Sequence, residues 1–148
     1  MKRIIGCGNL LLRDEGIGVH LIEYLKKQTL PDDVELVDGA TSGFDLIPVI
    51  QEAERVVIVD AIQAGGAPGD MYRFSAEDLT ARPVGIASLH DISLSDVLSI
   101  IRTVGTLPPV TIIGVQPKDT AVGMELSAQV AELLPRLSSL VLEEINHA

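Results

Sequence analysis

The stretch GCGNLLLRDEGIG, residues 6–18, joins a short apolar run to a segment with helical spacing. The apolar run, residues 2–7, has the length of a buried strand. In the segment that follows, one face of the expected helix carries the apolar residues Ile17, Leu21, Ile22 and Leu25. A glycine-rich loop between a strand and a helix is typical of an α/β sheet. The stretch therefore predicts a strand, a long loop and a helix in this order.

The same alternation continues along the chain. Further strand-like runs cover residues 34–38, 55–62 and 110–115, and helical spacing covers residues 18–28, 44–53 and 93–105. We expect a three-layer αβα sandwich, with helices on both faces of a twisted, mostly parallel sheet of about five strands. The short run MYRF, residues 71–74, is interpreted as an extra strand, placed at an antiparallel edge.

Local signals predict where two of the helices begin and end. Ser93 and Asp96 form a capping-box pattern for the third long helix, and Gly105 closes it. The apolar stripe from Leu126 onward predicts a final helix that is kinked at Pro135, because proline removes a backbone donor.

Composition restricts the class of protein. The chain has 148 residues, which we interpret as a single domain over 1–148, and 47% of them are hydrophobic. The formal net charge of −10, without a basic cluster, argues against a nucleic-acid partner. Cys7 is the single cysteine, which favours a reducing compartment. With no apolar run of membrane-spanning length, we expect a cytoplasmic protein that has no membrane partner and works as a monomer.

Three loops are expected at the carboxyl ends of the strands, where ligands of α/β sheets bind. They carry Glu15, Asp60 and His90, and two carboxylates with one imidazole suit a divalent transition metal with open coordination positions. Each residue also has an ordinary explanation. Acids are favoured at a helix N-terminus, a strand-end aspartate accepts bonds from the next turn, and a lone histidine is usually a surface residue.

A dinucleotide site is an alternative interpretation of the opening stretch. Gly6 and Gly8 fit the G-x-G-x-x-G fingerprint, and Asp38 resembles the acid that binds a ribose. However, Leu11 occupies the position of the third glycine. The loop also runs on to Glu15 before a helix can start, and acids beside a phosphate would repel it. A nucleotide-binding protein would need a helix that starts close to Gly8.

The opening stretch, the run VVIVDAI at residues 56–62 and the run ASLHDISLSDVL at residues 87–98 together resemble the nickel-iron hydrogenase maturation endopeptidases. The order and the distances of the three blocks match that family, and the resemblance extends to the final helix. It implies an aspartyl-type endopeptidase that removes the C-terminal extension of the hydrogenase large-subunit precursor. The metal-contacting and catalytic residues it implies are Glu15, Asp60 and His90, and the nickel is expected to arrive with the precursor.

The resemblance also implies roles for the loop. Its glycine-asparagine turn corresponds to Gly6, Gly8 and Asn9, and we expect Asn9 to bond loop backbone. Gly16 and Gly18 are expected to leave space for a bulky protein substrate. Cys7, where the family often has a larger aliphatic residue, is interpreted as core packing. A non-catalytic nickel-delivery chaperone that uses the same three residues stays open as an alternative.

Overall fold

The computed structural model describes residues 1–81 and 89–147, with side chains described outside residues 79–93. Its elements, in chain order, are β1 (Lys2–Cys7), the 3₁₀ turn η1 (Arg13–Gly16), α1 (Ile17–Leu25), β2 (Val34–Ala40), α2 (Leu46–Gln51), β3 (Arg55–Ala61), β4 (Met71–Ser75), α3 (Ala76–Ala81), α4 (Leu89–Val104), β5 (Val110–Val115), α5 (Ala128–Ala131) and α6 (Leu134–Asn146).

The five strands form one sheet in the order β2-β1-β3-β5-β4. The pairs β1–β2, β1–β3 and β3–β5 are parallel, and β4 joins β5 antiparallel at the edge. This confirms the expected mostly parallel sheet and the antiparallel edge strand near residue 71. Because β1 and β3 are parallel neighbours with Gly6 opposite Val59, the loops that follow both strands leave the sheet at the same edge.

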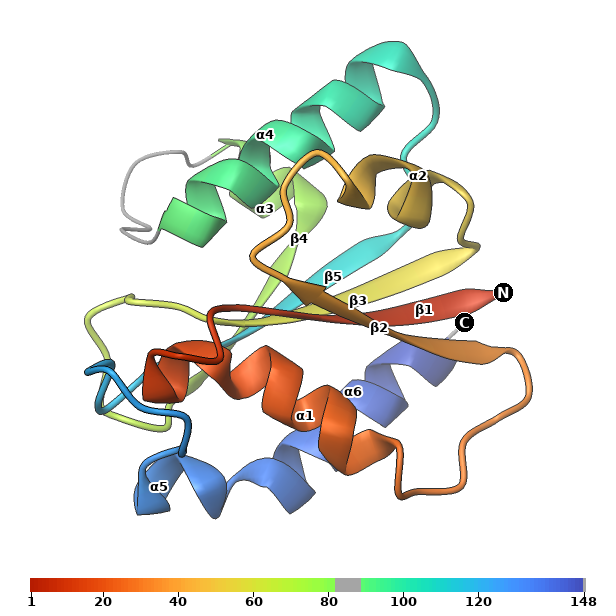
Figure 1. Ribbon diagram of the computed structural model, residues 1–148. Coiled ribbons are helices and arrows are strands. Elements are labelled where there is room, and N and C mark those ends of the chain that lie inside the picture. The colour runs from red at the N-terminus through yellow and green to blue at the C-terminus, as the bar shows by residue number, and fades with distance from the viewer. Residues whose placement is uncertain (82–88, 148) are drawn as a thin grey trace.

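Helices cover both faces of the sheet, as expected (Figure 1). Figure 1 shows α2, α3 and α4 on one face and α1, α5 and α6 on the other. The strands are rich in Val and Ile and supply side chains to an apolar core on each face. Ile5, Ile58 and Ile112 face the α2–α4 core, while Ile4, Val57 and Ile113 face the α1–α6 core. The alternation fits strands that are covered on both sides.

Two helix boundaries differ from the expectation. Helix α4 already starts at Leu89, so Ser93 lies inside the helix and is not its N-cap, while the predicted end before Gly105 is correct. The C-terminal apolar stripe forms two helices, α5 and α6, and Pro135 lies in the first turn of α6. The expected kinked helix is therefore wrong. A proline is well accommodated in a first turn, where no partner for its missing amide is required.

Helix α1 packs unusually close to the sheet, because Gly6 on β1 faces Gly18 on α1. A Cβ atom at Gly18 would overlap the backbone of Cys7 and Val59, and one at Gly6 would overlap the Gly18 carbonyl. Gly16 is buried as well, against the backbone of Leu10. The expectation that Gly16 and Gly18 leave space for a substrate is therefore wrong. Backbone of the protein itself occupies the space beside them.

Candidate active site

The turn that leaves β1 depends on Gly8. Its φ is +128°, in a region that side-chain-bearing residues rarely adopt, and its amide donates to the Ala40 carbonyl at 2.7 Å. A Cβ at Gly8 would overlap the Glu15 carbonyl oxygen and lie 3.3 Å from Asp60 Oδ1. Gly8 thus lies next to both the Glu15 backbone and the Asp60 carboxylate. The turn therefore brings the backbone of Glu15 close to the carboxylate of Asp60, although the two residues are far apart in sequence.

Asp60 is held at the end of β3 with only 1% of its surface exposed. Its Oδ1 accepts a hydrogen bond from the Ala61 amide at 2.8 Å. The four residues before it are buried in the sheet, which fixes the position of the carboxylate. The prediction that Asp60 lies at the carboxyl edge of the sheet is confirmed, although it is buried there and does not project into an open crevice.

Glu15 lies in the turn η1, immediately before α1, and is half-buried. Its amide donates to the Leu12 carbonyl at 3.0 Å, which closes the turn. His90 lies in the first turn of α4, but its side chain is outside the part that the structure describes. The structure thus places the backbone of Glu15 and the carboxylate of Asp60 on either side of Gly8. The convergence of the Glu15, Asp60 and His90 side chains remains a prediction.

Asp14 has a different role from its neighbour Glu15. Its side chain is fully buried and accepts four hydrogen bonds. The donors are the amides of Lys118, Asp119 and Ser127 and the Ser127 hydroxyl, at 2.7–2.9 Å. Burial by itself would raise the pKa of Asp14, but the hydrogen bonds from Asp119, Ser127 and Lys118 outweigh it and lower the pKa below its ordinary value. Asp14 is thus an ionised anchor for the loop that follows β5.

The sequence reasoning missed this anchor. It treated Asp14 and Glu15 as one acidic pair at a helix N-terminus, because both occupy positions where acids are generally favoured. The partners of Asp14 lie more than a hundred residues further along the chain. The local sequence offers one weak signal, since Ser127 lies immediately before the first residue of α5, where serine is a common helix cap.

The loop after β5, residues 116–127, is joined to the opening loop by further bonds. The Arg13 guanidinium pairs with the Asp119 carboxylate and donates to the Glu125 carbonyl at 3.0 Å. Gly123 exchanges backbone hydrogen bonds with Leu11 and Arg13 at 2.8 and 2.9 Å. In Figure 1 the blue segment before α5 lies against the red loop before α1. The two loops form one connected edge of the molecule.

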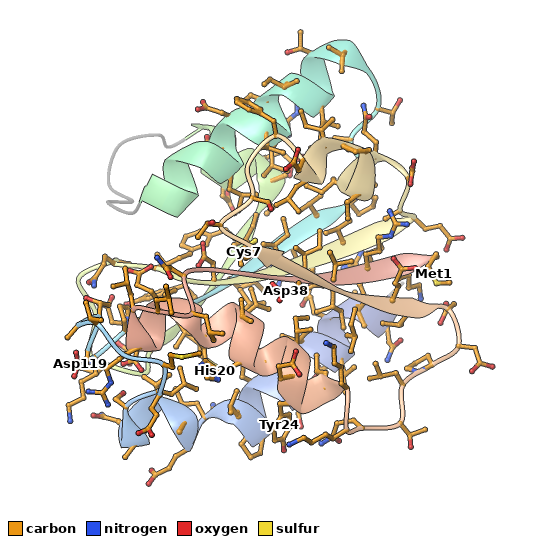
Figure 2. All side chains as sticks on the ribbon, viewed as in Figure 1. Met1, Cys7, His20, Tyr24, Asp38 and Asp119 are labelled. Atoms are coloured by element: carbon orange, nitrogen blue, oxygen red, sulfur yellow. The ribbon has the colours of Figure 1, made fainter. Side chains whose placement is uncertain are left out.

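Two smaller predictions are confirmed. Asn9 Oδ1 accepts a hydrogen bond from the Leu11 amide at 2.9 Å, so Asn9 holds the turn as expected. Cys7 is buried within the α2–α4 core, and Figure 2 shows it on that face of the sheet. It also lines a small pocket, together with Asp60 and side chains from α2 and α4.

The nucleotide interpretation is wrong for this loop. Helix α1 begins at Ile17, well beyond Gly8, and the turn η1 with its two acidic residues comes first. The helix N-terminus therefore does not meet the glycine turn, as a pyrophosphate site requires. Asp38 uses its carboxylate locally, accepting a hydrogen bond from the Ala40 amide at 2.9 Å.

Comparison with known proteins identifies the family to which the chain belongs. The family model described as hydrogenase maturation protease matches residues 19–144. The chain belongs to the hydrogenase maturation protease family. It is 36% identical over 134 residues to the hydrogenase 2 maturation protease of Escherichia coli, an alignment that covers 88% of this chain and 82% of that protein. The HybD maturating endopeptidase structure from E. coli superposes with a TM-score of 0.89 at 34% identity, covering 97% of this chain and 90% of that one.

Other relatives in the family are longer. The chain is 38% identical over 120 residues to the hydrogenase expression/formation protein HoxM of Azotobacter vinelandii, which covers 78% of this chain and 58% of HoxM. As a member of this protease family the chain is a hydrolase, and both the fold class and the endopeptidase class expected from the sequence are confirmed. Among the described residues, no helix is long and apolar enough to cross a bilayer.

Proposed function

We propose that this protein removes the C-terminal extension of a nickel-loaded nickel-iron hydrogenase large-subunit precursor. The observation that carries the proposal is the Gly8 turn, which places the Glu15 backbone and the Asp60 carboxylate side by side at the carboxyl edge of the sheet. Membership of the maturation protease family supports the choice of substrate. The nickel belongs to the precursor and enters the site with it.

In this proposal Glu15, Asp60 and His90 contact the nickel of the precursor. Two carboxylates and one imidazole suit a divalent transition metal and leave coordination positions for the ligands that the precursor supplies. Without a thiolate the three residues would bind a free ion weakly. Such weak binding suits a site that checks whether the precursor has been loaded.

The chemical step is hydrolysis of one peptide bond, with an aspartate carboxylate as general base, as in an aspartyl-type protease. The base takes a proton from water while the water oxygen attacks the scissile carbonyl carbon. The C–N bond then breaks, and the proton passes to the leaving amine. Burial of Asp60 suits this role, because a carboxylate removed from solvent interacts more strongly with charge that develops beside it.

The test uses purified large-subunit precursor in nickel-loaded and nickel-free forms, followed by mass measurement of the product. We expect loss of a C-terminal peptide from the loaded form alone. Binding without any cleavage would support the nickel-delivery chaperone instead. A free peptide that copies the C-terminal extension should not be cut, because it lacks the folded, metal-loaded body. Rapid cleavage of that peptide would contradict the proposal that the site checks whether the precursor carries nickel.

We also propose that the protein acts in the cytoplasm as a monomer that meets the precursor transiently. The chain has a single cysteine, Cys7, which is buried, and this suits a reducing compartment. A net charge of −10 opposes self-association. Sedimentation of the purified protein at micromolar concentration should give the mass of one chain, and a stable dimer would contradict the monomer.

A further inference from the structure

Three large apolar side chains are exposed on the two joined loops. They are Leu11, Val122 and Met124, with 58%, 87% and 57% of their surfaces exposed. We call these three residues the loop patch. Single exposed apolar residues are common on soluble proteins, whereas contiguous exposed apolar patches mark interaction surfaces.

The backbone shows that the three residues are neighbours. The Gly123 amide donates to the Leu11 carbonyl at 2.8 Å, and the Arg13 amide donates to the Gly123 carbonyl at 2.9 Å. Leu12 and Gly123 form an isolated parallel bridge. Val122 and Met124 flank the bridged glycine, so both lie beside the segment that carries Leu11.

The loop patch is held firmly in place. Asp14 anchors residues 118, 119 and 127 through four hydrogen bonds, and Arg13 binds Asp119 and the Glu125 carbonyl. An apolar surface that is already ordered loses little conformational entropy when a partner binds. These loops therefore have the properties of a prepared contact surface.

We propose that the loop patch docks an apolar area on the folded body of the precursor, outside the segment that is cut. This inference rests on the proposed function and names how the same substrate is held. The patch is continuous with the candidate site, because Leu11 and Glu15 belong to one loop that the Leu12–Glu15 hydrogen bond closes. A protein that presents its nickel to Glu15 and Asp60 would lie close to this loop.

The net charge of the chain favours a different protein, rather than a second copy of this chain, as the partner that binds the loop patch. Two copies that each carry −10 repel each other, and three side chains offer too little apolar area to overcome this. Within the patch, the Arg13 charge is balanced by the Asp119 carboxylate. The three patch side chains are themselves uncharged, which suits an apolar area on the partner.

The test is the cleavage of nickel-loaded precursor by the triple variant Leu11→Ser, Val122→Ser, Met124→Ser. We expect KM to rise about tenfold or more, with kcat at saturation nearly unchanged, because the lost contacts are equally present in the ground and transition states. Val122→Ser and Val104→Ser form a matched pair. Val104, at the end of α4, is 68% exposed but lies outside the joined loops. Only Val122→Ser should raise KM.

The possible outcomes separate a failure of the docking role from a failure of the proposed function. A triple variant with unchanged KM, beside a wild-type protein that cleaves the precursor, would overturn the docking role and leave the proposed function intact. If the wild-type protein does not cleave, the proposed function fails, and direct binding of the precursor to wild-type and triple variant still decides the role of the patch. A wild-type dimer that the triple variant converts to monomers would show that the patch binds a second copy. Thermal unfolding of the variants should match the wild type.

Discussion

Asp14 and Ser127 are joined by two hydrogen bonds across 113 positions of the chain. The Asp14 carboxylate accepts from the Ser127 amide at 2.8 Å and from the Ser127 hydroxyl at 2.7 Å. Ser127 is the N-cap of α5, so this contact connects the start of the last two helices to the loop that carries Glu15. The geometry of the candidate site thus depends on a residue that is not expected to touch the substrate.

Replacing Asp14 by Asn should destabilise the protein strongly. An amide nitrogen would face donors that now bind a carboxylate oxygen, and a buried group without a suitable partner is costly. We expect a loss of about 3 kcal/mol in the free energy of unfolding, measured by urea denaturation. Asp38→Asn is the control, because Asp38 is exposed and accepts one local hydrogen bond. Equal stability of the two variants would contradict the anchoring role.

Gly8→Ala should impair both folding and cleavage. The backbone there has a positive φ, and an added methyl group would overlap the Glu15 carbonyl. We expect a cost of about 3 kcal/mol or more, together with a lower kcat, because Glu15 must shift. Gly105→Ala is a matched control, since its nearest neighbour would lie 3.6 Å away, at ordinary contact distance. A Gly8→Ala protein with normal kcat would argue against the importance of this turn.

Gly18→Ala tests the close packing of α1 on the sheet. The added methyl group would overlap the backbone atoms of Cys7 and Val59, which cannot move as a flexible side chain could. We expect a loss of about 2 kcal/mol or more in unfolding experiments. If this variant were as stable as the wild type and cleaved a bulky precursor faster, the original interpretation of the glycine as substrate space would regain support.

The three proposed nickel contacts can be tested one at a time. Glu15→Gln, Asp60→Asn and His90→Ala should each reduce cleavage of nickel-loaded precursor by about a hundredfold or more. His147→Ala, at an exposed position after α6, should have no effect. Circular dichroism should show that Glu15→Gln remains folded, because Glu15 is half-buried in a turn. Cleavage at the wild-type rate by His90→Ala would remove that residue from the site.

Glu144 provides a stability prediction away from the site. It accepts bonds from Arg73, Arg55 and Thr111. The hydrogen bond from Arg73 lowers the pKa of Glu144 below its ordinary value, against the opposing effect of burial. The stabilisation is therefore present at neutral pH and is lost as the pH falls through the lowered pKa. Glu144→Gln should lower stability at pH 7 by about 1 kcal/mol, with the difference disappearing toward pH 2. KM should not change.

The fold was largely predictable because its signals are local and repeated. Short runs such as VTIIGV and RVVIVDA are rich in β-branched residues and have the length of a covered strand, and the helix stripes between them have the correct period. The order of the strands was not predictable from these patterns. The boundary at Ser93 failed because a capping pattern inside a longer helix looks the same as one at its start.

The candidate site was predictable only in part. Strand-end geometry indicated Asp60, since parallel strands deliver their following residues to one edge. The different roles of Asp14 and Glu15 were not predictable, because the two are adjacent acids and are distinguished by partners in a distant loop. The prediction that Gly18 leaves space for a substrate failed for a similar reason. It depends on how closely α1 approaches the backbone of β1 and β3.

The strand order has a consequence for biosynthesis. Strands β1, β2 and β3 are neighbours in the sheet and are complete once residue 61 has been made. Within the described part of the chain, β4 pairs with β5 alone, which follows it by more than thirty residues. A growing chain therefore holds β4 unpaired until β5 leaves the ribosome and inserts between β3 and β4. The Asp14 anchor closes later still, when Ser127 is available. Long-range closures of this kind form slowly. The protease thus completes its working edge only after Ser127 has been made, and chains that stop before this residue lack the Asp14 anchor.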